Sequence, residues 1–404
     1  MSKNPSTVKT NSLAGRTILQ IVPRLEAGGA ERTTVDIAEA IVKAGGTALV
    51  VAEPGRLVKD VERVGGEFIN MDAASKNPIQ MIKTAYALSK VIKARDVDIV
   101  HARSRAPAWP ALWAARLSGC AFMTTYHGIY SQRNAFKEFY NSVMTRGDVV
   151  IANSGMTAAL IEQRNPAAKA RTKTIYRGTD LGAFAESAVT QKRRDALIKQ
   201  WGLEAKDIER PLILNIARIS SWKGQDVLTK AMHQLLKAQI PDNPLLILAG
   251  GVQGDDGFLV AVQNLIEELG LSNHVRLVGH CDDVPAAMSL ATCAVVASTR
   301  EEAFGRAAVE AGAAKIPAIV TDHGGARETV LVPPGVLEQE RTGWRVPPGD
   351  INALTDALKI VLNLSAQERY KIGERAREHA TANFSLDSMC DQTLAVYGSL
   401  LRPK

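Results

Sequence analysis

Short apolar segments alternate with longer amphipathic segments along nearly the whole chain of 404 residues. A short apolar run is typical of a buried strand, and an amphipathic stretch between two such runs is typical of a crossover helix. The pattern therefore predicts parallel sheets whose strands are joined by helices. In the first half of the chain the predicted strands are Thr17–Val22, Ala48–Ala52, Ile99–His101, Ala121–Tyr126 and Val149–Ala152. In the second half they are Leu212–Ala217, Leu245–Ala249, Val275–Val278, Ala294–Ala297 and Ala318–Thr321.

A charged helical segment, Gln191–Trp201, separates the two halves, and the pattern restarts after it. The two openings are alike, since ILQIVPRLEAGGAERT and LILNIARISSWKGQDV each contain a strand, a basic loop with glycine and the start of a helix. A chain of this length is also too long for one ordinary core. We therefore expect two doubly wound, Rossmann-like α/β domains, at 1–187 and 188–384. Ligands of such sheets bind at the carboxyl ends of the strands, which predicts a cleft between the domains.

The basic residues are concentrated in the first half. The whole chain has a formal charge of +7, but residues 1–185 hold 25 basic and 15 acidic side chains, which gives +10. Such a half favours an anionic partner, for which a membrane surface and an anionic acceptor are both candidates. Nucleic acid is the weakest candidate because no recognised nucleic-acid motif is present. A plain solvated surface is the alternative.

The four cysteines, Cys120, Cys281, Cys293 and Cys390, are scattered and form no Cys-x2-Cys pair. This spacing disfavours a metal site or a disulfide framework and favours a reducing compartment. The first dozen residues lack the apolar segment of a signal peptide, and no run approaches the ~18 apolar residues that cross a bilayer. We expect a cytoplasmic protein, with any membrane contact peripheral and at the cytoplasmic face of the inner membrane.

Two carboxylates eight positions apart mark the segment STREEAFGRAAVEAGA, which begins at Ser298. Glu302 falls where a loop meets a helix, and we expect Glu310 to lie two turns inside that helix. The turn Phe304-Gly305-Arg306 between them supplies the unpaired amides and partial positive charge of a helix start. Carboxylates on either side of such an anion site can bind two polyols, as in a sugar joined through a diphosphate to a ribose. An exposed acidic loop before a helix is the alternative.

Two cations, Arg218 and Lys223, lie five positions apart in the loop ARISSWKGQD. Arg supplies a planar fork and Lys a mobile point charge, so both can reach one diphosphate. A leaving diphosphate gains negative charge, and fixed cations therefore lower the barrier more than they aid ground-state binding. A pair of surface cations at a loop is the alternative.

The first predicted strand is followed by Gly28-Gly29-Ala30-Glu31-Arg32, which opens a helix. Glycines let the backbone approach a ligand closely, and the helix start offers anion-binding amides, although a tight turn would explain them too. The pattern is not Gly-x-Gly-x-x-Gly, and no acidic residue closes the second strand, so NAD is excluded. His127 ends another strand beside Gly128, where an imidazole can meet a reacting centre; a packed or surface histidine is the alternative.

In this order, GGAER, the Arg-x4-Lys-Gly loop and Glu-x7-Glu resemble the motifs of the retaining family-4 glycosyltransferases, which have the GT-B fold. The resemblance covers roughly Thr17 to Tyr397. It implies that Glu310 holds the ribose hydroxyls and that Glu302 holds the hydroxyls of the donor sugar, helped by the amides of the turn between them. It also implies that Arg218 and Lys223 neutralise the diphosphate.

The same resemblance implies roles for further positions. His127 would contact the donor sugar, and Gly279-His280 would meet the nucleotide base, largely through the backbone. Gly324-Gly325 would lie in the loop that follows the Glu-x7-Glu helix and permit close packing at the cleft, and a C-terminal helix at about 385–404 would pack back on the first domain. The turn Arg177-Gly178-Thr179-Asp180 resembles the family's Asn-Gly-Val-Asp, with an unexplained Arg in place of Asn.

The segments expected to bind the acceptor match no known sequence motif. Arg103 and Arg105 could help to hold an anionic acceptor. Trp109 and Trp113 share a predicted helical face among arginines, and the segment from Arg133 to Tyr140 repeats this mixture. Such segments can dock on anionic lipid, although core helices show the same spacing. Together with the basic first half, this pattern favours a lipid-borne acceptor over a free sugar.

We therefore expect a retaining, metal-independent glycosyltransferase with no cofactor beyond its nucleoside-diphosphate sugar co-substrate. Its partners would be this donor, a glycan or glycolipid acceptor such as a lipopolysaccharide core or a polysaccharide intermediate, and an anionic membrane surface, but no nucleic acid. Asp96-Val97-Asp98 spells a metal motif of another fold, but it precedes a strand and so lies away from the expected cleft. A nucleotide-sugar epimerase of the same fold and a non-catalytic sugar-nucleotide-binding partner are the alternatives.

Overall fold

The computed structural model describes residues 12–26, 28–130, 134–238, 243–252 and 256–401. These residues form two compact units. One unit ends at Gly178 and resumes at Leu386, and the other runs from Thr179 to Ser385.

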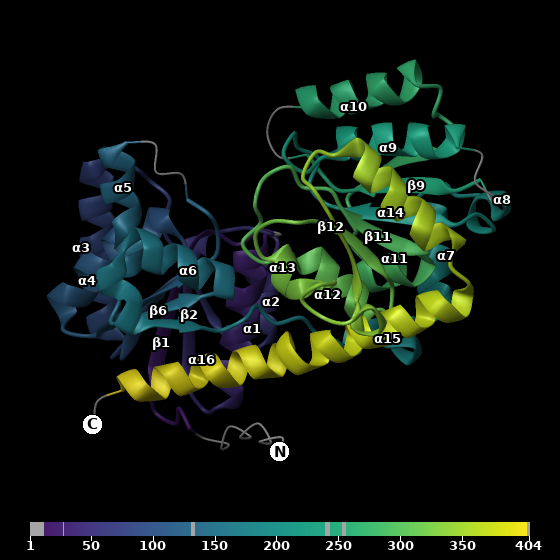
Figure 1. The fold of residues 1–404 in the computed structure, drawn as a ribbon. Helices are drawn as coiled ribbons and strands as arrows, with labels where there is room; N and C mark the ends of the chain where they lie inside the picture. Colours follow the sequence, from purple (N-terminus) through teal and green to yellow (C-terminus); the bar gives the residue numbers. More distant parts are fainter. Residues whose placement is uncertain (1–11, 27, 131–133, 239–242, 253–255, 402–404) are drawn as a thin grey trace. The chain divides into compact units, whose positions relative to one another are not determined.

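The first unit contains one parallel sheet of seven strands in the order β3-β2-β1-β4-β5-β6-β7 (Figure 1). The five strands predicted from apolar runs are present. The two outer strands, β3 and β7, were not predicted because they are short and half-exposed and so lack an apolar run. The strands are β1 Thr17–Arg24, β2 Thr47–Glu53, β3 Glu67–Asn70, β4 Ile99–Ala102, β5 Ala121–Tyr126, β6 Val149–Ala152 and β7 Thr172–Thr174.

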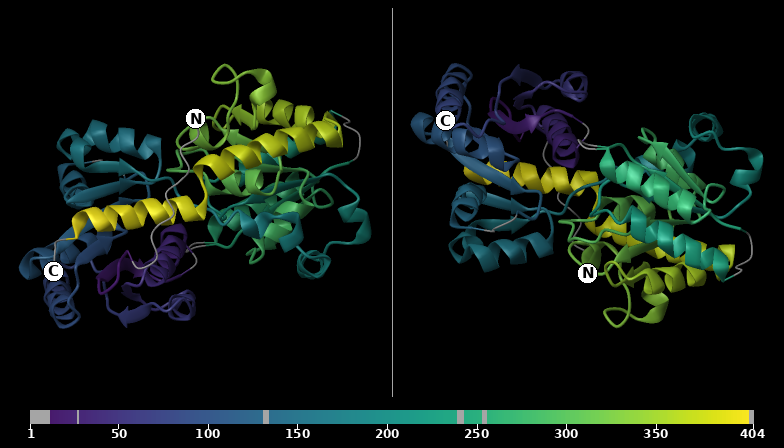
Figure 2. Two further views of the ribbon diagram at one scale, coloured as in Figure 1. Left: turned by 90° about the horizontal axis from the view of Figure 1, so that it is seen from below. Right: turned by 90° about the horizontal axis from the view of Figure 1, so that it is seen from above.

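Helices cover both faces of this sheet and enclose two apolar cores. The C-terminal helix α16 belongs to this unit (Figures 1 and 2). Its residues Met389 and Tyr397 enter the same core as α1. The helices are α1 Gly29–Lys43, α2 Val58–Arg63, α3 Pro78–Ala94, α4 Arg105–Ser118, α5 Ala135–Ser142, α6 Gly155–Arg164 and α16 Leu386–Leu400, with 3-10 turns at Val143–Thr145 and Pro166–Arg171.

The second unit repeats the design with six parallel strands in the order β10-β9-β8-β11-β12-β13. The five predicted strands are again present, and the outer strand β13 was not predicted. The strands are β8 Leu212–Ile216, β9 Leu245–Ala249, β10 Val275–Gly279, β11 Cys293–Val296, β12 Ala318–Thr321 and β13 Gly343–Val346. The helices are α7 Gln191–Gln200, α8 Ala205–Ile208, α9 Gln225–Lys237, α10 Gly257–Glu268, α11 Val284–Leu290, α12 Arg306–Ala313, α13 Ala326–Thr329, α14 Ile351–Asn363 and α15 Ala366–Asn383, with 3-10 turns at Gly182–Phe184, Glu186–Ala188 and Glu338–Glu340.

Each sheet reverses its winding direction once. In the first unit the reversal lies between β1 and β4, and in the second it lies between β8 and β11. Loops diverge at such a point and leave a crevice at the carboxyl ends of the two strands, where ligands of open α/β sheets bind. The order of the strands therefore predicts that ligand-binding residues lie in the loops after β1 and β4 and in those after β8 and β11.

Candidate functional site

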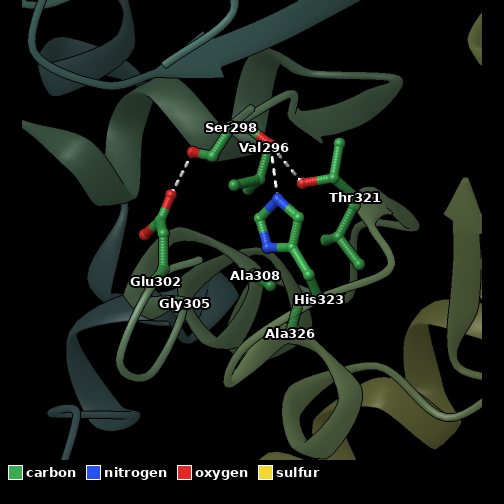
Figure 3. A pocket seen from close by; sticks show the side chains of 9 residues that line it. Val296, Ser298, Glu302, Gly305, Ala308, Thr321, His323 and Ala326 are labelled. Atoms are coloured by element: carbon green, nitrogen blue, oxygen red, sulfur yellow. Dashed lines mark hydrogen bonds between the residues drawn. The ribbon is translucent and has the colours of Figure 1, made fainter. Parts of the chain in front are cut away.

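The loops after β8 and β11 bring a lysine and a glutamate together. Lys223 Nζ lies 2.7 Å from Glu302 Oε1, and both side chains are largely buried. The Ser298 hydroxyl donates to the same carboxylate oxygen (Figure 3). Glu302 is therefore held by a cation and a hydroxyl that come from two different strand ends, and its second oxygen is not engaged by this lysine or serine.

Backbone contacts fix the lysine loop against the glutamate loop. The Thr299 amide donates to the Trp222 carbonyl at 2.8 Å. Gly224 follows Lys223 with a φ of +71°, and a side chain there would collide with the Ala297 carbonyl. Glycine is required at this position because both the positive φ and the close approach exclude a Cβ. The short distance between Lys223 and Glu302 is therefore a consequence of backbone geometry.

The loop after β12 also contacts the loop that carries Glu302. Gly325 donates its amide to the Glu302 carbonyl at 2.8 Å. A Cβ on Gly325 would lie 2.5 Å from Cα of Phe304, so the lack of a side chain allows this loop to pack closely against the turn before α12. Phe304 is buried and meets Phe384 edge-to-face at 5.3 Å between ring centroids.

Helix α12 starts directly after this turn. Gly305 is its N-cap, with a φ of +91°, and Arg306 is its first residue. Glu310 is the fifth helical residue, so it lies about one turn inside the helix, and the expected two turns were wrong. Its side chain is only 6% exposed and pairs with Arg306 Nε at 2.8 Å. The first amides of a helix have no intrahelical acceptor, which leaves an anion-binding position beside this carboxylate.

Three further predicted donor residues, Arg218, Gly279 and His280, lie at neighbouring strand ends of the same unit. Arg218 is exposed, and its carbonyl accepts from the Gln225 side chain at 3.0 Å. Gly279 ends β10 with a φ of +73°, and the exposed His280 pairs with Asp282 at 3.2 Å. Burial raises the pKa of the adjacent Cys281 thiol to about 12.

The first unit has its own recess at the ends of its central strands. The recess is lined by Thr33, Arg103, Thr125, His127, Ile151, Asn153, Ile175, Arg177, Met389 and Thr393. Gly28 is the N-cap of α1 and Gly29 its first residue. The Arg177 guanidinium donates to the Gly29 carbonyl, and a Cβ on Gly29 would lie 2.6 Å from Cζ of Arg177. This contact gives a structural role to the arginine that the sequence left unexplained.

His127 lies in this recess as a neutral imidazole. Within the part of the chain that the structure describes, neither of its ring nitrogens has a hydrogen-bond partner. Burial, followed by the positive charges of Arg103 and Arg177, lowers its pKa well below the usual value. A neutral ring offers one donor and one acceptor, and both are left for a ligand.

Comparison with known proteins identifies the family. The family model described as Glycosyltransferase Family 4 matches residues 27–183, and the family model described as Glycosyl transferases group 1 matches residues 201–379. The crystal structure of a glycosyltransferase from Rickettsia africae ESF-5 is 30% identical, with a TM-score of 0.84, and the match covers 96% of this chain and 99% of that chain. The chain belongs to the family-4 glycosyltransferases of GT-B fold.

Two further relatives are informative. The GDP-mannose-dependent alpha-(1-6)-phosphatidylinositol monomannoside mannosyltransferase of Mycobacterium tuberculosis is 26% identical over 315 residues, which is 75% of this chain and 76% of the relative. Anabaena HepE in complex with UDP-glucose has the same fold, with a TM-score of 0.78 and 23% identity over 95% of this chain and 100% of that chain. The expected GT-B fold and family are thus confirmed.

Three further side chains line the same pocket as Glu302 and were not predicted from the sequence. Ser298 and His323 lie just after β11 and β12, and Thr321 is the last residue of β12. The Ser298 carbonyl accepts from Thr321 Oγ1 and His323 Nε2, each at 2.8 Å (Figure 3). A carbonyl only accepts, so Nε2 carries the ring proton and Nδ1 is an acceptor. Among the described residues, His323 Nδ1 is buried without a partner. The rule that ligands bind at strand ends could have identified both Ser298 and His323.

The predicted acceptor-side arginines of the glycosyltransferase differ in exposure. Arg103 lines the recess but is only 2% exposed, and it donates from Nε to Gln20 Oε1 at 2.7 Å. Burial lowers its pKa, although the nearby Tyr397 hydroxyl and Asp36 favour its charged form. Arg105 is half-buried, donates to Asn141 at 2.9 Å and lies over the Tyr130 ring at 4.2 Å.

The spacing of Trp109 and Trp113 left two interpretations open, a lipid-docking face and an ordinary core helix, and the structure supports the core helix. Trp109 is 6% exposed and Trp113 packs against the same core, with 5.8 Å between the two rings. The aromatic spacing thus marks the buried face of α4. On α5, by contrast, Phe136 and Phe139 are exposed, while Arg133 lies outside the described residues.

Asp98, in the sequence that spells a metal motif, has a structural role. It accepts from the Thr17 amide at 2.8 Å and pairs with Arg16 at 2.9 Å. These contacts tie the start of β1 to the start of β4, at the amino ends of the strands. Within the described ranges, no three His, Cys, Asp or Glu side chains are grouped as a metal site would require.

Proposed function

We propose that this glycosyltransferase is a retaining, metal-independent enzyme that moves a sugar from a nucleoside-diphosphate sugar to a membrane-linked glycan. The observation that carries the proposal is the cluster of Lys223, Ser298 and Glu302 beside the start of α12, with the buried Glu310 one turn later. A cation, a helix start and two carboxylates together match an anion flanked by two polyols.

The donor would bind through four groups of the second unit. Glu310 would accept from the ribose hydroxyls, and Glu302 would accept from hydroxyls of the transferred sugar, beside the amides of Phe304-Gly305-Arg306. Lys223 and Arg218 would neutralise the diphosphate. Charge grows on the diphosphate as the glycosidic bond breaks, so these cations stabilise the transition state more than the bound substrate. Gly279 and His280 would meet the base.

His127 and the Gly28-Gly29 turn would act on the donor from the first unit. We propose that His127 contacts the donor sugar at the reacting face, where its neutral ring can both donate and accept. No residue is proposed as a covalent nucleophile. The acceptor oxygen would attack on the face that the diphosphate leaves, and the departing phosphate oxygen would take the acceptor's proton, which retains the configuration.

The acceptor is proposed to be a lipopolysaccharide core or a polysaccharide lipid intermediate. The mycobacterial relative is named for a phosphatidylinositol mannoside acceptor, which supports a lipid-borne acceptor here. Arg103 lines the recess of the first unit and would supply positive charge to an anionic acceptor, with Arg105 nearby in the chain. HepE binds UDP-glucose, which makes UDP-sugars the first donors to test.

The deciding experiment is calorimetry with a panel of UDP-, GDP- and ADP-sugars, followed by an assay of nucleotide release with and without a lipid-glycan extract. One tight binder whose nucleoside diphosphate appears only with the extract would support the transferase and identify its donor. A sugar nucleotide that is altered without acceptor would indicate an epimerase instead. If no sugar nucleotide binds, the proposal is wrong.

Metal independence has a separate test. Activity should persist in EDTA, because Lys223, Arg218 and the start of α12 are proposed to carry the positive charge that a metal would otherwise provide. Loss of activity in EDTA that a divalent cation restores would overturn this part of the proposal. Product stereochemistry, read from the anomeric proton by NMR, tests retention.

A further inference from the structure

Helix α3 carries an exposed stripe of apolar and basic side chains. Ile79, Ile82 and Tyr86 are 67%, 61% and 61% exposed, and three exposed lysines follow the same line. At about 100° per residue, all six positions fall within an arc of about 100° on the helix surface. We call these six residues the α3 stripe: Ile79, Ile82, Lys83, Tyr86, Lys90 and Lys93.

The side of α3 opposite the stripe packs into the core of the first unit, which is sufficient to stabilise the helix. Met81, Leu88 and Ile92 are buried in the core of the first unit, and α3 packs along α4. Asn77 caps the helix by accepting from the amides of Ile79 and Gln80. The helix therefore does not need the stripe for its own packing, and two exposed isoleucines one turn apart need another explanation.

Charge distinguishes the kinds of partner that could cover this stripe. Between Ala73 and Arg95 the chain contains five basic residues and no acidic residue. Arg95 pairs with Glu67, but no ion pair within the described ranges involves Lys83, Lys90 or Lys93. Lys90 lies over the Tyr86 ring at 4.5 Å, so its charge is held beside the apolar part of the stripe.

Lysine among exposed aliphatic side chains fits a lipid surface better than a protein. Lysine is depleted from the cores of protein interfaces. At an anionic bilayer, by contrast, aliphatic side chains enter the acyl boundary while long lysine stems keep their charges among the headgroups. None of the described helices has both the length and the apolar character to span a bilayer, so this contact would be interfacial.

We propose that the α3 stripe docks the first unit onto an anionic lipid bilayer. The proposal deepens the proposed function, since it would bring the enzyme to the surface that presents a lipid-borne acceptor. It does not depend on turnover, because lipid binding is measured without substrates. The α3 stripe is exposed, whereas Trp109 and Trp113, the other candidates for lipid contact, are packed in the core.

Vesicle co-sedimentation of the full-length protein tests the proposal. The protein should bind phosphatidylcholine vesicles that contain about one third phosphatidylglycerol, should bind pure phosphatidylcholine vesicles weakly, and should be released by added salt. The triple change Lys83→Gln, Lys90→Gln and Lys93→Gln should lower the partition coefficient about fivefold for each lysine removed. The double change Ile79→Ser and Ile82→Ser should lower it at least about tenfold.

Matched controls lie on the second unit. Lys192→Gln, Lys199→Gln and Lys371→Gln remove the same charge from exposed positions, and Val260→Ser with Ile360→Ser removes two aliphatic side chains that are also about half exposed. Both controls should bind vesicles like the unchanged protein. Equal losses in the control and stripe variants would overturn the proposal, as would an absence of binding to anionic vesicles at low salt.

Two further measurements separate the possible failures. Donor binding by calorimetry should be unchanged in the stripe variants, which also shows that they fold. If donor binding fails in every form while vesicles still bind through α3, the proposed function is wrong and the docking surface stands. If light scattering shows a dimer that the Ile79→Ser, Ile82→Ser variant loses, and vesicles do not bind, a second copy of the chain covers the stripe and the lipid proposal is wrong.

Discussion

Both units carry charged side chains in the loops that follow the central strands of their sheets, but the partners of these charges differ. In the second unit Lys223 is paired with Glu302 at 2.7 Å, and Glu310 with Arg306 at 2.8 Å. In the first unit Arg103 is buried, and no ion pair of the described residues joins it to a carboxylate. The second unit thus carries ion pairs that a ligand must share or displace, whereas the first unit keeps buried positive charge.

This difference predicts how each unit responds to an anion. If the donor binds as proposed, its diphosphate would compete with Glu302 for Lys223, and the released carboxylate would become available to sugar hydroxyls. Phosphate and sugar recognition would then be coupled through one ion pair. In the first unit an anion would compensate a buried guanidinium, whose desolvation is otherwise balanced only by neutral groups and the more distant Asp36. Four changes sharpen or break the comparison.

The largest effect is expected from Lys223→Ala. It removes a cation from the leaving diphosphate and also leaves the buried Glu302 without its partner. We expect kcat to fall by about 10²–10³-fold, the range typical of lost transition-state stabilisation. Steady-state kinetics checks this, with Lys230→Ala on the exposed side of α9 as the control. Near-normal turnover would remove Lys223 from the site.

Glu310→Ala should act mainly on donor affinity. Loss of two hydrogen bonds from a buried carboxylate to ribose hydroxyls corresponds to roughly 3 kcal/mol, or about 100-fold in Kd. Calorimetry with the preferred sugar nucleotide measures this change. The exposed Glu301→Ala serves as the control, and equal affinity in the two variants would contradict the proposed ribose contact.

Arg177→Asn tests whether this side chain holds the start of α1 in the first unit. It introduces the asparagine that stands at this position in the family's Asn-Gly-Val-Asp turn. It removes the bond from the guanidinium to the Gly29 carbonyl, and we expect the local stability of α1 to fall by about 1 kcal/mol. Hydrogen exchange measured by mass spectrometry should show faster exchange in the first turns of α1. The exposed Lys173→Asn should leave this exchange unchanged, and unaltered exchange in Arg177→Asn would show that the contact does not hold the turn.

The smallest effect is a pH dependence from His127. Its pKa in the folded protein is lowered by burial and by two arginines, so the unfolded chain takes up the proton first. Its contribution to stability is therefore complete above about pH 6.5 and is lost progressively as the pH falls below that value. Urea unfolding of His127→Asn should decline less steeply with acid than that of the unchanged protein. His233→Asn is the control, and identical slopes would argue against a buried neutral His127.

Sequence reasoning found the parts of the fold that depend on local pattern. Continuous apolar runs revealed the central strands, while β3, β7 and β13 lie at sheet edges, where burial is incomplete or the strand is short and the run disappears. For the site, the spacing of Glu302, Glu310, Arg218 and Lys223 was enough to propose a cluster. The aromatic spacing of Trp109 and Trp113 left a lipid-docking face and a core face open, because helical periodicity does not say which face is buried.

What the sequence could not supply depends on contacts between distant segments. Ser298 and His323 meet only because β11 and β12 are neighbours in the sheet. The Arg177 contact joins residues 148 positions apart, and it explains a departure from the family turn that had no local explanation. The exposed α3 stripe could not be predicted, because its isoleucines and tyrosine have the spacing of core residues and the sequence does not show that this face is exposed.

The return of α16 to the first unit has a consequence for how the chain is made. The Tyr397 hydroxyl bonds to the buried His101 ring at 2.8 Å across 296 positions of sequence. A ribosome therefore completes every residue of the second unit before it delivers the helix that finishes the first. Until then α1 lacks its contacts with α16 and His101 lacks its tyrosine, so the amino-terminal unit, although synthesised first, cannot reach its final packing before α16 has been made.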